Sequence, residues 1–230
     1  MLPILVLLPG LDGTGDLFAP FLSCLKAAIE KKVVRYPADS RLDYSALIDL
    51  AGRQLPEDRP FILLAESFSG PIAICLAAAK PKNLAGLILC ATFARHPYQR
   101  LRYLGPLLNV IPLRSLAFWS VKRFLLSRFG TEDLEENIKR VVGALDPKMY
   151  AKRLQESIRV NVSGELEQLS VPLLYLSASD DRLVPYSAAK VFSRPEREWQ
   201  VKKIVGPHLL LQAVPADTAD EVMRFLQSFE

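Results

Sequence analysis

The sequence predicts an α/β fold with a mostly parallel central sheet and helices on both of its faces. Apolar runs of strand length alternate with longer segments whose apolar residues recur at helical spacing. Some of these runs contain no polar residue, which is typical of strands buried between two layers of helices. The 230 residues, 50% apolar and 23% charged, suffice for one well-buried core and have a globular composition.

The first ninety residues alternate between strands and helices. Strands are expected at Pro3–Leu8, Val33–Tyr36, Phe61–Ala65 and Leu84–Cys90. Helices are expected at Leu17–Lys31, Tyr44–Leu55 and Pro71–Ala79. Asp43 can cap the second helix and Pro56 follows it, so its boundaries are the clearest. Helical connections between successive strands predict parallel pairing.

The same alternation returns after residue 167. Strands are expected at Val171–Ser177 and Glu198–Val205, with a helix near Ser187–Phe192 between them and a last helix from about Pro215 to Phe229. The core is therefore predicted to comprise residues 1–93 and 168–230.

Residues 94–167 interrupt this alternation and are predicted to be a helical lid or cap insertion. Helices are expected at Leu113–Phe129, Glu132–Leu145 and Pro147–Arg159. Acidic residues at the start of the second helix suit the helix dipole, and Asp146 with Pro147 forms a typical start for the third. The segment is too long to be a simple loop.

The composition argues against several classes of protein. Two histidines are too few for a His-rich metal site, and no motif indicates a cofactor. The net charge of +4 comes without a dense Lys/Arg stripe, so no nucleic-acid partner is expected. Cys24, Cys75 and Cys90 form no C-x-x-C pair and lie in apolar stretches, which indicates buried free thiols in a reducing compartment.

The sequence also predicts a cytoplasmic protein without a membrane span. No window approaches the roughly 18 apolar residues that a span requires. The apolar start, Met1–Leu8, lacks the positive flank and the cleavage site of a secretory signal, and a strand is the better interpretation.

Ser67 stands where a buried strand meets a helix, in the segment Ala65-Glu-Ser-Phe-Ser-Gly-Pro71. A nucleophilic serine needs such a turn, because the turn lifts Oγ clear of the sheet and the helix N-terminus favours developing negative charge. Small residues, Ala65 and Ser69, stand two positions to either side and allow close packing. The alternative is an ordinary turn with a serine N-cap. Ser69 is the poorer nucleophile because it lies inside the first helical turn.

His208 and two adjacent aspartates complete a candidate catalytic set. His208 follows the last predicted strand, and Asp180 and Asp181 follow the strand before it, so both loops lie at the carboxyl edge of the sheet with Ser67. A serine hydroxyl needs a base to take its proton, and the base needs a carboxylate to orient it. The alternatives are a core histidine and a surface turn rich in Ser and Asp. Spacing does not choose between Asp180 and Asp181.

These segments together resemble the α/β-hydrolases. The Ser67 turn is similar to the G-x-S-x-G nucleophile elbow of that family, with both glycines replaced by other small residues, and the order Ser, Asp, His is the family's order. The run Asp181-Arg-Leu-Val-Pro185 resembles the family's acid loop, which implies Asp181 as the acid. The resemblance covers residues 1–89 and 171–230, while residues 94–167 match in position only.

The loop after the first strand, Leu7-Leu-Pro-Gly-Leu-Asp-Gly-Thr-Gly15, resembles the family's H-G-x oxyanion loop with Pro9 in place of the histidine. The resemblance implies the backbone N–H groups of Leu11 and Phe68 as donors to the oxyanion. The same loop resembles that of phytyl ester synthase-type acyltransferases and of many small bacterial hydrolases. A phosphate-binding loop is disfavoured, because the glycines are not spaced as G-x-G-x-x-G and no Gly-Lys-Ser/Thr follows.

The insertion has an unusual charge pattern. Residues 94–130 contain seven basic residues and no Asp or Glu, interleaved with aromatic and apolar residues. A lid that is apolar beneath and cationic above suits an acyl chain on an anionic carrier. A solvated basic face and a contact with anionic membrane lipids are the alternatives. No catalytic role is assigned to His96 or Trp119.

The expected activity is that of a serine hydrolase that cleaves a carboxylic ester or thioester, possibly carrier-linked, through an acyl-enzyme. Ser67 is the nucleophile, His208 the general base and acid, and Asp181 the orienting acid, with no cofactor and no metal. Two alternatives remain open. An acyltransferase uses an alcohol in place of water at the second step, and a binding protein can retain the fold without catalysis.

Overall fold

The computed structural model describes residues 2–98, 100, 103 and 121–229. Within these residues, the sheet has six strands in the order β2-β1-β3-β4-β5-β6, and every pairing is parallel. The strands are β1 (Ile4–Leu8), β2 (Lys31–Val33), β3 (Phe61–Glu66), β4 (Leu84–Cys90), β5 (Leu173–Ala178) and β6 (Trp199–Ile204). The predicted fold class, a mostly parallel sheet with helices on both faces, is confirmed.

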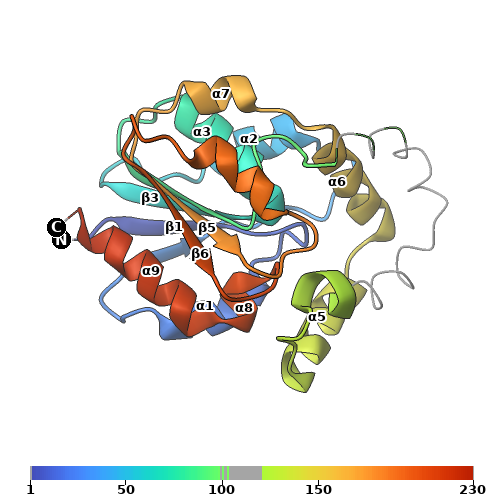
Figure 1. The fold of residues 1–230 in the computed structure, drawn as a ribbon. Helices are drawn as coiled ribbons and strands as arrows, with labels where there is room; N and C mark the ends of the chain where they lie inside the picture. The colour runs from blue at the N-terminus through green and yellow to red at the C-terminus, as the bar shows by residue number, and fades with distance from the viewer. Residues whose placement is uncertain (1, 99, 101–102, 104–120, 230) are drawn as a thin grey trace.

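Helices cover both faces of the sheet (Figure 1). On one face lie α2 (Tyr44–Gly52), α3 (Gly70–Ala78) and α7 (Ser163–Glu167), and on the other lie α1 (Ala19–Cys24), α8 (Leu210–Ala213) and α9 (Pro215–Gln227). Shorter 3₁₀ segments are η1 (Asp16–Phe18), η2 (Ser67–Ser69) and η5 (Tyr186–Phe192). Asp43 caps α2 as expected, since its carboxylate accepts a hydrogen bond from the N–H of Ala46.

Alternate residues of each strand pack into two separate cores, one under each layer of helices. In β3, Phe61, Leu63 and Ala65 face the α2/α3 side, whereas Ile62 and Leu64 face the α1/α9 side. Both sets are fully buried, which explains why the strand has no polar residue before Glu66. The central position of β3 therefore fixes the place from which the chain enters the Ser67 turn.

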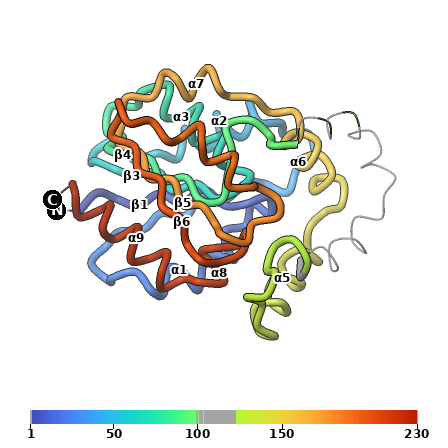
Figure 2. Tube along the Cα trace, in the orientation of Figure 1, coloured from blue at the N-terminus to red at the C-terminus, as the bar shows by residue number. Residues whose placement is uncertain are grey.

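Three described helices of the inserted segment lie beyond the carboxyl ends of the strands, whereas α7, which also falls within residues 94–167, covers one face of the sheet. The three are η4, a π-helical segment (Val121–Leu126), α5 (Glu132–Gly143) and α6 (Pro147–Arg159). Figure 2 shows α5 and α6 beside one end of the core. The caps of α5 and α6 are Thr131 and Asp146, and both accept a backbone hydrogen bond. Of the expected helix Leu113–Phe129, residues 113–120 lie outside the described residues, and Val121–Leu126 forms η4.

The structure corrects two of the predicted elements. The helix expected at Leu17–Lys31 ends at Cys24, because the carbonyl of Glu30 already accepts from the N–H of Leu5 and the chain must leave the helix early to reach β1. The strand expected at Val33–Tyr36 is paired over Lys31–Val33. Sheet pairing has overridden local helix propensity here.

The prediction of three buried thiols is correct for one cysteine alone. Cys90 is buried, Cys75 is partly buried and Cys24, the last residue of α1, is exposed. The buried residue of α1 is Phe21, so an apolar stretch does not by itself bury each of its members.

Candidate active site

Ser67 adopts a backbone conformation that side chains other than glycine rarely take. Its φ is 49°, and it joins β3 directly to η2 and α3. Such a left-handed residue costs on the order of 1–3 kcal/mol and persists where its surroundings impose it. Here the hydroxyl of Thr92, which follows β4, donates a hydrogen bond to the carbonyl of Ser67 and holds the turn.

Gly70 shows how closely the turn packs against the neighbouring strand. A Cβ at this position would lie 1.9 Å from Oγ1 of Thr92, so a side chain cannot be placed here without moving the turn. Ala65 and Ser69 are completely buried on either side. Gly70 is therefore required by its contact with the loop after β4.

Ser67, His208 and Asp181 form one chain of hydrogen bonds. Oγ of Ser67 lies 2.8 Å from Nε2 of His208, and Nδ1 of His208 lies 2.8 Å from Oδ2 of Asp181. The side chains of His208 and Asp181 are 3% and 1% exposed. The loops after β3, β5 and β6 thus bring together three residues that lie far apart in the sequence.

The two adjacent aspartates point in different directions. The second carboxylate oxygen of Asp181 accepts hydrogen bonds of 2.8 Å from the N–H groups of Leu183 and Val184, which fixes the side chain against His208. Asp180 instead accepts from the hydroxyl of Ser179 and lies 3.7 Å from the guanidinium of Arg128. The structure therefore places Asp181, and not Asp180, at the imidazole.

The surroundings of His208 favour its protonated form. Burial by itself lowers the pKa of His208, but the charge of Asp181 and its hydrogen bond more than offset this, and Glu66 adds to the effect, so the pKa is raised above its usual value. An imidazole with this partner can accept a proton and is stabilised as the imidazolium.

Leu11 and Phe68 lie in loops that follow two neighbouring strands, β1 and β3. Leu8 of β1 pairs with Ala65 of β3. Leu11 lies three residues after Leu8, and Phe68 lies three residues after Ala65. Phe68 is held by a stack on Tyr44, with ring centroids 4.7 Å apart, and its carbonyl accepts from the Tyr44 hydroxyl at 2.9 Å. Both predicted oxyanion donors therefore lie on the same edge as Ser67.

Ser69, which occupies a glycine position of the family's elbow, connects the two loops. Its hydroxyl donates to the carbonyl of Pro9, and the hydroxyl of Tyr36 lies 2.7 Å from its oxygen and can donate to it. Tyr36 is buried, and burial raises its phenol pKa well above the usual range, so the O–H donor is kept. The side chain that replaces the glycine thus ties the Ser67 turn to the loop after β1.

Glu66 is a buried carboxyl group that sequence reasoning missed. It ends β3 directly before Ser67, is 2% exposed, and accepts a hydrogen bond of 3.1 Å from the amide of Gln212. Among the described residues, Oε1 of Glu66 and Oε1 of Gln212 are buried without a hydrogen-bond partner. The available signal was a charged residue at the end of an otherwise apolar strand.

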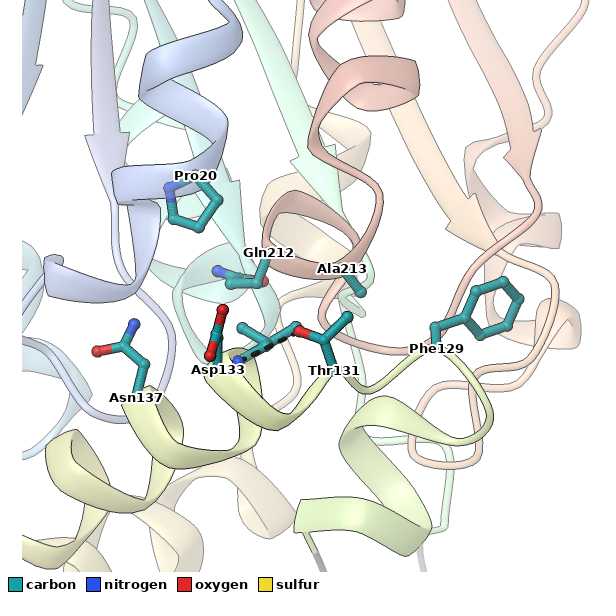
Figure 3. Close-up of a pocket in the computed structure, with 8 residues that line it drawn as sticks. Pro20, Phe129, Thr131, Asp133, Asn137, Gln212 and Ala213 are labelled. Atoms are coloured by element: carbon teal, nitrogen blue, oxygen red, sulfur yellow. Dashed lines mark hydrogen bonds between the residues drawn. The ribbon is translucent and has the colours of Figure 1, made fainter.

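A pocket of about 340 Å³ lies beside this pair (Figure 3). It is bounded by the start of α1, by α5 with its N-cap, and by α8. The lining residues are Pro20, Phe129, Thr131, Asp133, Leu134, Asn137, Gln212 and Ala213. Gln212 therefore contacts Glu66 and also forms part of the wall between the core and the inserted segment.

In the wild type, Glu66 is expected to lower the free energy of unfolding as pH rises, and Glu66→Gln is expected to abolish this effect. Burial raises the pKa of Glu66 from 4.5 to about 7, despite the opposing hydrogen bond from Gln212. The unfolded chain therefore releases this proton at lower pH than the folded chain, and the free energy of unfolding falls as pH rises between the two values. The shift corresponds to about 3 kcal/mol.

Urea unfolding of the wild type and Glu66→Gln at about pH 5 and about pH 8 measures this effect. From about pH 5 to about pH 8, the free energy of unfolding of the wild type should fall by up to about 3 kcal/mol relative to that of the variant. Other titrating groups are common to both proteins and cancel in the comparison. Equal changes in the two proteins would show that Glu66 is not the group responsible.

The chain belongs to the hydrolase family described as "Serine aminopeptidase, S33", whose sequence model matches residues 31–206. This match confirms the predicted membership of the α/β-hydrolases and places the chain among hydrolytic enzymes.

Two curated proteins are similar in sequence. The biotin biosynthesis bifunctional protein BioHC of Cellvibrio japonicus is 26% identical over 98% of this chain and 48% of its own length. Phytyl ester synthase 1, chloroplastic, of Arabidopsis thaliana is 29% identical over 48% of this chain and 16% of its own length. The chain thus spans about half or less of the length of these relatives.

Solved structures of low sequence identity share the fold. An enol-lactonase from Burkholderia xenovorans superposes with a TM-score of 0.85 at 16% identity, covering 99% of this chain and 92% of that one. An esterase from Thermogutta terrifontis gives 0.81 at 18% identity, with 99% and 90% covered. MenH from S. aureus gives 0.80 at 16% identity, with 98% and 94% covered.

Two further findings concern residues 2–98, 100, 103 and 121–229. None of the helices in this part of the chain is both long and apolar enough to cross a membrane. The same residues contain no group of three or more His, Cys, Asp or Glu side chains arranged to hold a metal ion.

Proposed function

We propose that this chain is a serine hydrolase that cleaves a carboxylic ester or thioester through an acyl-enzyme. The observation that carries the proposal is the continuous hydrogen-bonded chain from Oγ of Ser67 through both nitrogens of His208 to Asp181, with 2.8 Å at each step. It follows the geometry by which a base activates a serine and a carboxylate fixes the tautomer of that base.

The reaction runs in two proton-balanced halves. Oγ of Ser67 attacks the carbonyl carbon while Nε2 of His208 takes its proton, and the collapse of the tetrahedral intermediate returns that proton to the leaving alcohol or thiol. A water then attacks the acyl-Ser67 ester, gives a proton to His208, and the acid departs as Ser67 recovers its proton. Asp181 stays ionised and stabilises the imidazolium in both halves.

The N–H groups of Leu11 and Phe68 are the proposed donors to the oxyanion. The strand register supports this proposal, because the two loops follow Leu8 and Ala65, which are paired partners in the sheet. Two backbone donors held on rigid loops stabilise the charge that develops on the carbonyl oxygen, and each is worth on the order of 10²–10³ in rate.

Residues 94–167 are proposed to form the lid of this site, with residues 1–93 and 168–230 as the core. The N–H of Leu209, next to His208, donates to the carbonyl of Leu125 at 3.2 Å. Leu126 and residues of α5 form an apolar cluster with Leu17 and Leu209. An acyl substrate, free or attached to an anionic carrier, is proposed to bind beneath this segment, which carries the excess of basic residues.

Acyl transfer to an alcohol is the second candidate function. The similarity to phytyl ester synthase 1, which covers 48% of this chain, favours it. The first half of the reaction is the same, and an alcohol replaces water in the second half. Mass spectrometry of products formed from one acyl thioester in the presence of water and a long-chain alcohol distinguishes the two outcomes by the ratio of free acid to ester.

A fluorophosphonate probe tests the proposed nucleophile. Attack by Oγ of Ser67 on phosphorus forms an O–P bond and releases fluoride, which leaves a stable adduct at that residue. The wild type is expected to label, and Ser67→Ala to lose all labelling. Ser157→Ala is the control, because this serine is also buried but its hydroxyl donates to the carbonyl of Leu154 within α6, so labelling at Ser67 should remain.

An unlabelled wild type, or equal labelling of Ser67→Ala, would rule out this assignment. The first result favours a binding protein that retains the fold without catalysis.

A further inference from the structure

Arg153 is a charged side chain in an unusual place. It belongs to α6, an amphipathic helix of the inserted segment, and is 2% exposed. Burial lowers the pKa of Arg153, and the charge of Asp12 partly offsets this, but a guanidinium keeps its proton in a protein. A buried charge of this kind needs several well-placed hydrogen-bond partners.

The partners of Arg153 are backbone carbonyls in the first quarter of the chain. Nη1 donates to the carbonyls of Leu11 and Asp12, each at 2.9 Å, and Nη2 donates to the carbonyl of Pro37 at 2.9 Å. The guanidinium also lies over the ring of Tyr36, 5.6 Å from its centroid. A side chain of the insertion thus reaches across 142 residues of sequence to the loop after β1.

The Arg153 contacts fix the turn that contains a proposed oxyanion donor. The N–H of Gly13 donates to the carbonyl of Gly10 at 3.1 Å, so Leu11 and Asp12 are the central residues of a turn. One nitrogen of Arg153 binds the carbonyls of both central residues. The N–H of Leu11 belongs to the preceding peptide group, whose carbonyl, that of Gly10, closes the same turn by accepting from Gly13. Arg153 therefore acts on this N–H by fixing the turn as a whole.

Gly13 is shaped to accept this guanidinium. Its φ is 74°, and a Cβ there would lie 2.3 Å from Nη1 of Arg153. The other side of the loop is held by the hydroxyl of Ser69, which donates to the carbonyl of Pro9. Arg153 and Ser69 therefore restrain the loop from two sides.

We propose that Arg153 is a positioning residue for catalysis, which holds the Leu11 N–H in line with the oxyanion from the inserted segment. This inference rests on the proposed serine hydrolase function. It makes α6 part of the machinery that stabilises the transition state, in addition to any role of the insertion in covering substrate. An arginine with a purely structural role would change the free energy of unfolding but not the stabilisation of the charge that develops on the carbonyl oxygen.

The test compares a p-nitrophenyl ester with the thionoester of the same acyl chain. A thionoester develops its charge on sulfur, a poor hydrogen-bond acceptor, so its hydrolysis depends less on the oxyanion donors. Arg153→Met should lower kcat for the ester by about 10-fold to 10²-fold, with KM within about 2-fold of wild type, which is less than the loss of a whole donor. The ratio of ester to thionoester kcat should fall, and Arg153→Lys should recover part of it.

Arg197 provides a matched control. It donates to the carbonyls of Leu169 and Glu167 at 2.8 and 2.9 Å and lies over the ring of Trp199, but it precedes β6 and so belongs to the opposite end of the sheet from Ser67. Arg197→Met should leave the ester-to-thionoester ratio unchanged, even where it lowers the melting temperature.

An unchanged ratio in a folded Arg153→Met, or an equal fall for both substrates, overturns the inference. Folding is checked by circular dichroism, and if Arg153→Met does not fold, the ratio in Arg153→Lys decides in the same way. A wild type that neither labels with fluorophosphonate nor hydrolyses the ester overturns the proposed function and this inference with it. An active wild type with variants of unchanged ratio overturns the inference alone.

Discussion

His208→Ala is expected to lower kcat for ester hydrolysis by about 10⁶-fold, with the fold retained. Nε2 of His208, 2.8 Å from Oγ of Ser67, is the proposed acceptor of the serine proton, and without it a neutral hydroxyl must attack unaided. In triads of this kind, loss of the base costs nearly as much as loss of all three residues, because they act as a unit. Steady-state kinetics with a p-nitrophenyl ester, together with circular dichroism, measures the effect.

The second histidine supplies the control for this variant. His96 is partly buried and packs edge-on to Phe93, with 5.2 Å between ring centroids, whereas the imidazole that faces Oγ of Ser67 is that of His208. His96→Ala should keep kcat within a few-fold of wild type. A residual rate in His208→Ala close to that of wild type would remove His208 from the mechanism.

The wild-type pH profile should reflect the same residue. Hydrolysis requires neutral His208, so kcat/KM should fall as pH drops through the pKa of that imidazole. Because Asp181 raises the pKa above its usual value, the fall should begin at higher pH than for an isolated histidine.

Asp181→Asn is expected to lower kcat by about 10⁴-fold, whereas Asp180→Asn should change it little. The amide at position 181 cannot stabilise the imidazolium, and it favours the wrong tautomer of His208. Asp180 shares the same loop and charge but faces Arg128 at 3.7 Å, in a pair exposed enough to contribute little to stability. Of the two side chains, that of Asp181 contacts Nδ1 of His208, whereas that of Asp180 contacts Ser179 and Arg128.

Kinetics of both variants at one pH above the His208 pKa give the comparison. A large loss in Asp180→Asn with a small loss in Asp181→Asn would assign the acid to the other residue. Equal, small losses in both would show that neither carboxylate contributes to catalysis.

The central strands of the fold were predictable because they are buried on both faces. Phe61–Ala65 shows this best, since every residue is apolar and each alternate side chain enters a different core. Leu17–Lys31 was harder, because local spacing favoured a helix while pairing of the chain near Glu30 with β1 required an extended backbone. That competition is decided by residues far away in the sequence.

The site was predictable where it depends on position in the sheet, and less so where it depends on side-chain direction. Ser67 and His208 follow strands of the sheet, so their loops could be placed on one edge. Spacing could not choose between Asp180 and Asp181, since adjacent side chains point apart. Arg153 was not foreseen, because an arginine on an amphipathic helix predicts a solvated face and its partner loop is 142 residues away.

The separation of the site residues along the chain has a consequence for the order of folding. Ser67 and His208 are 141 residues apart, and the loop of Leu11 is completed by a side chain from α6. Such contacts form late in folding, because a long stretch of chain must lose conformational entropy before they form. During synthesis the Ser67 turn leaves the ribosome well before its base. Ser67 should therefore become reactive only when folding is nearly complete, and folding intermediates should contain no activated serine.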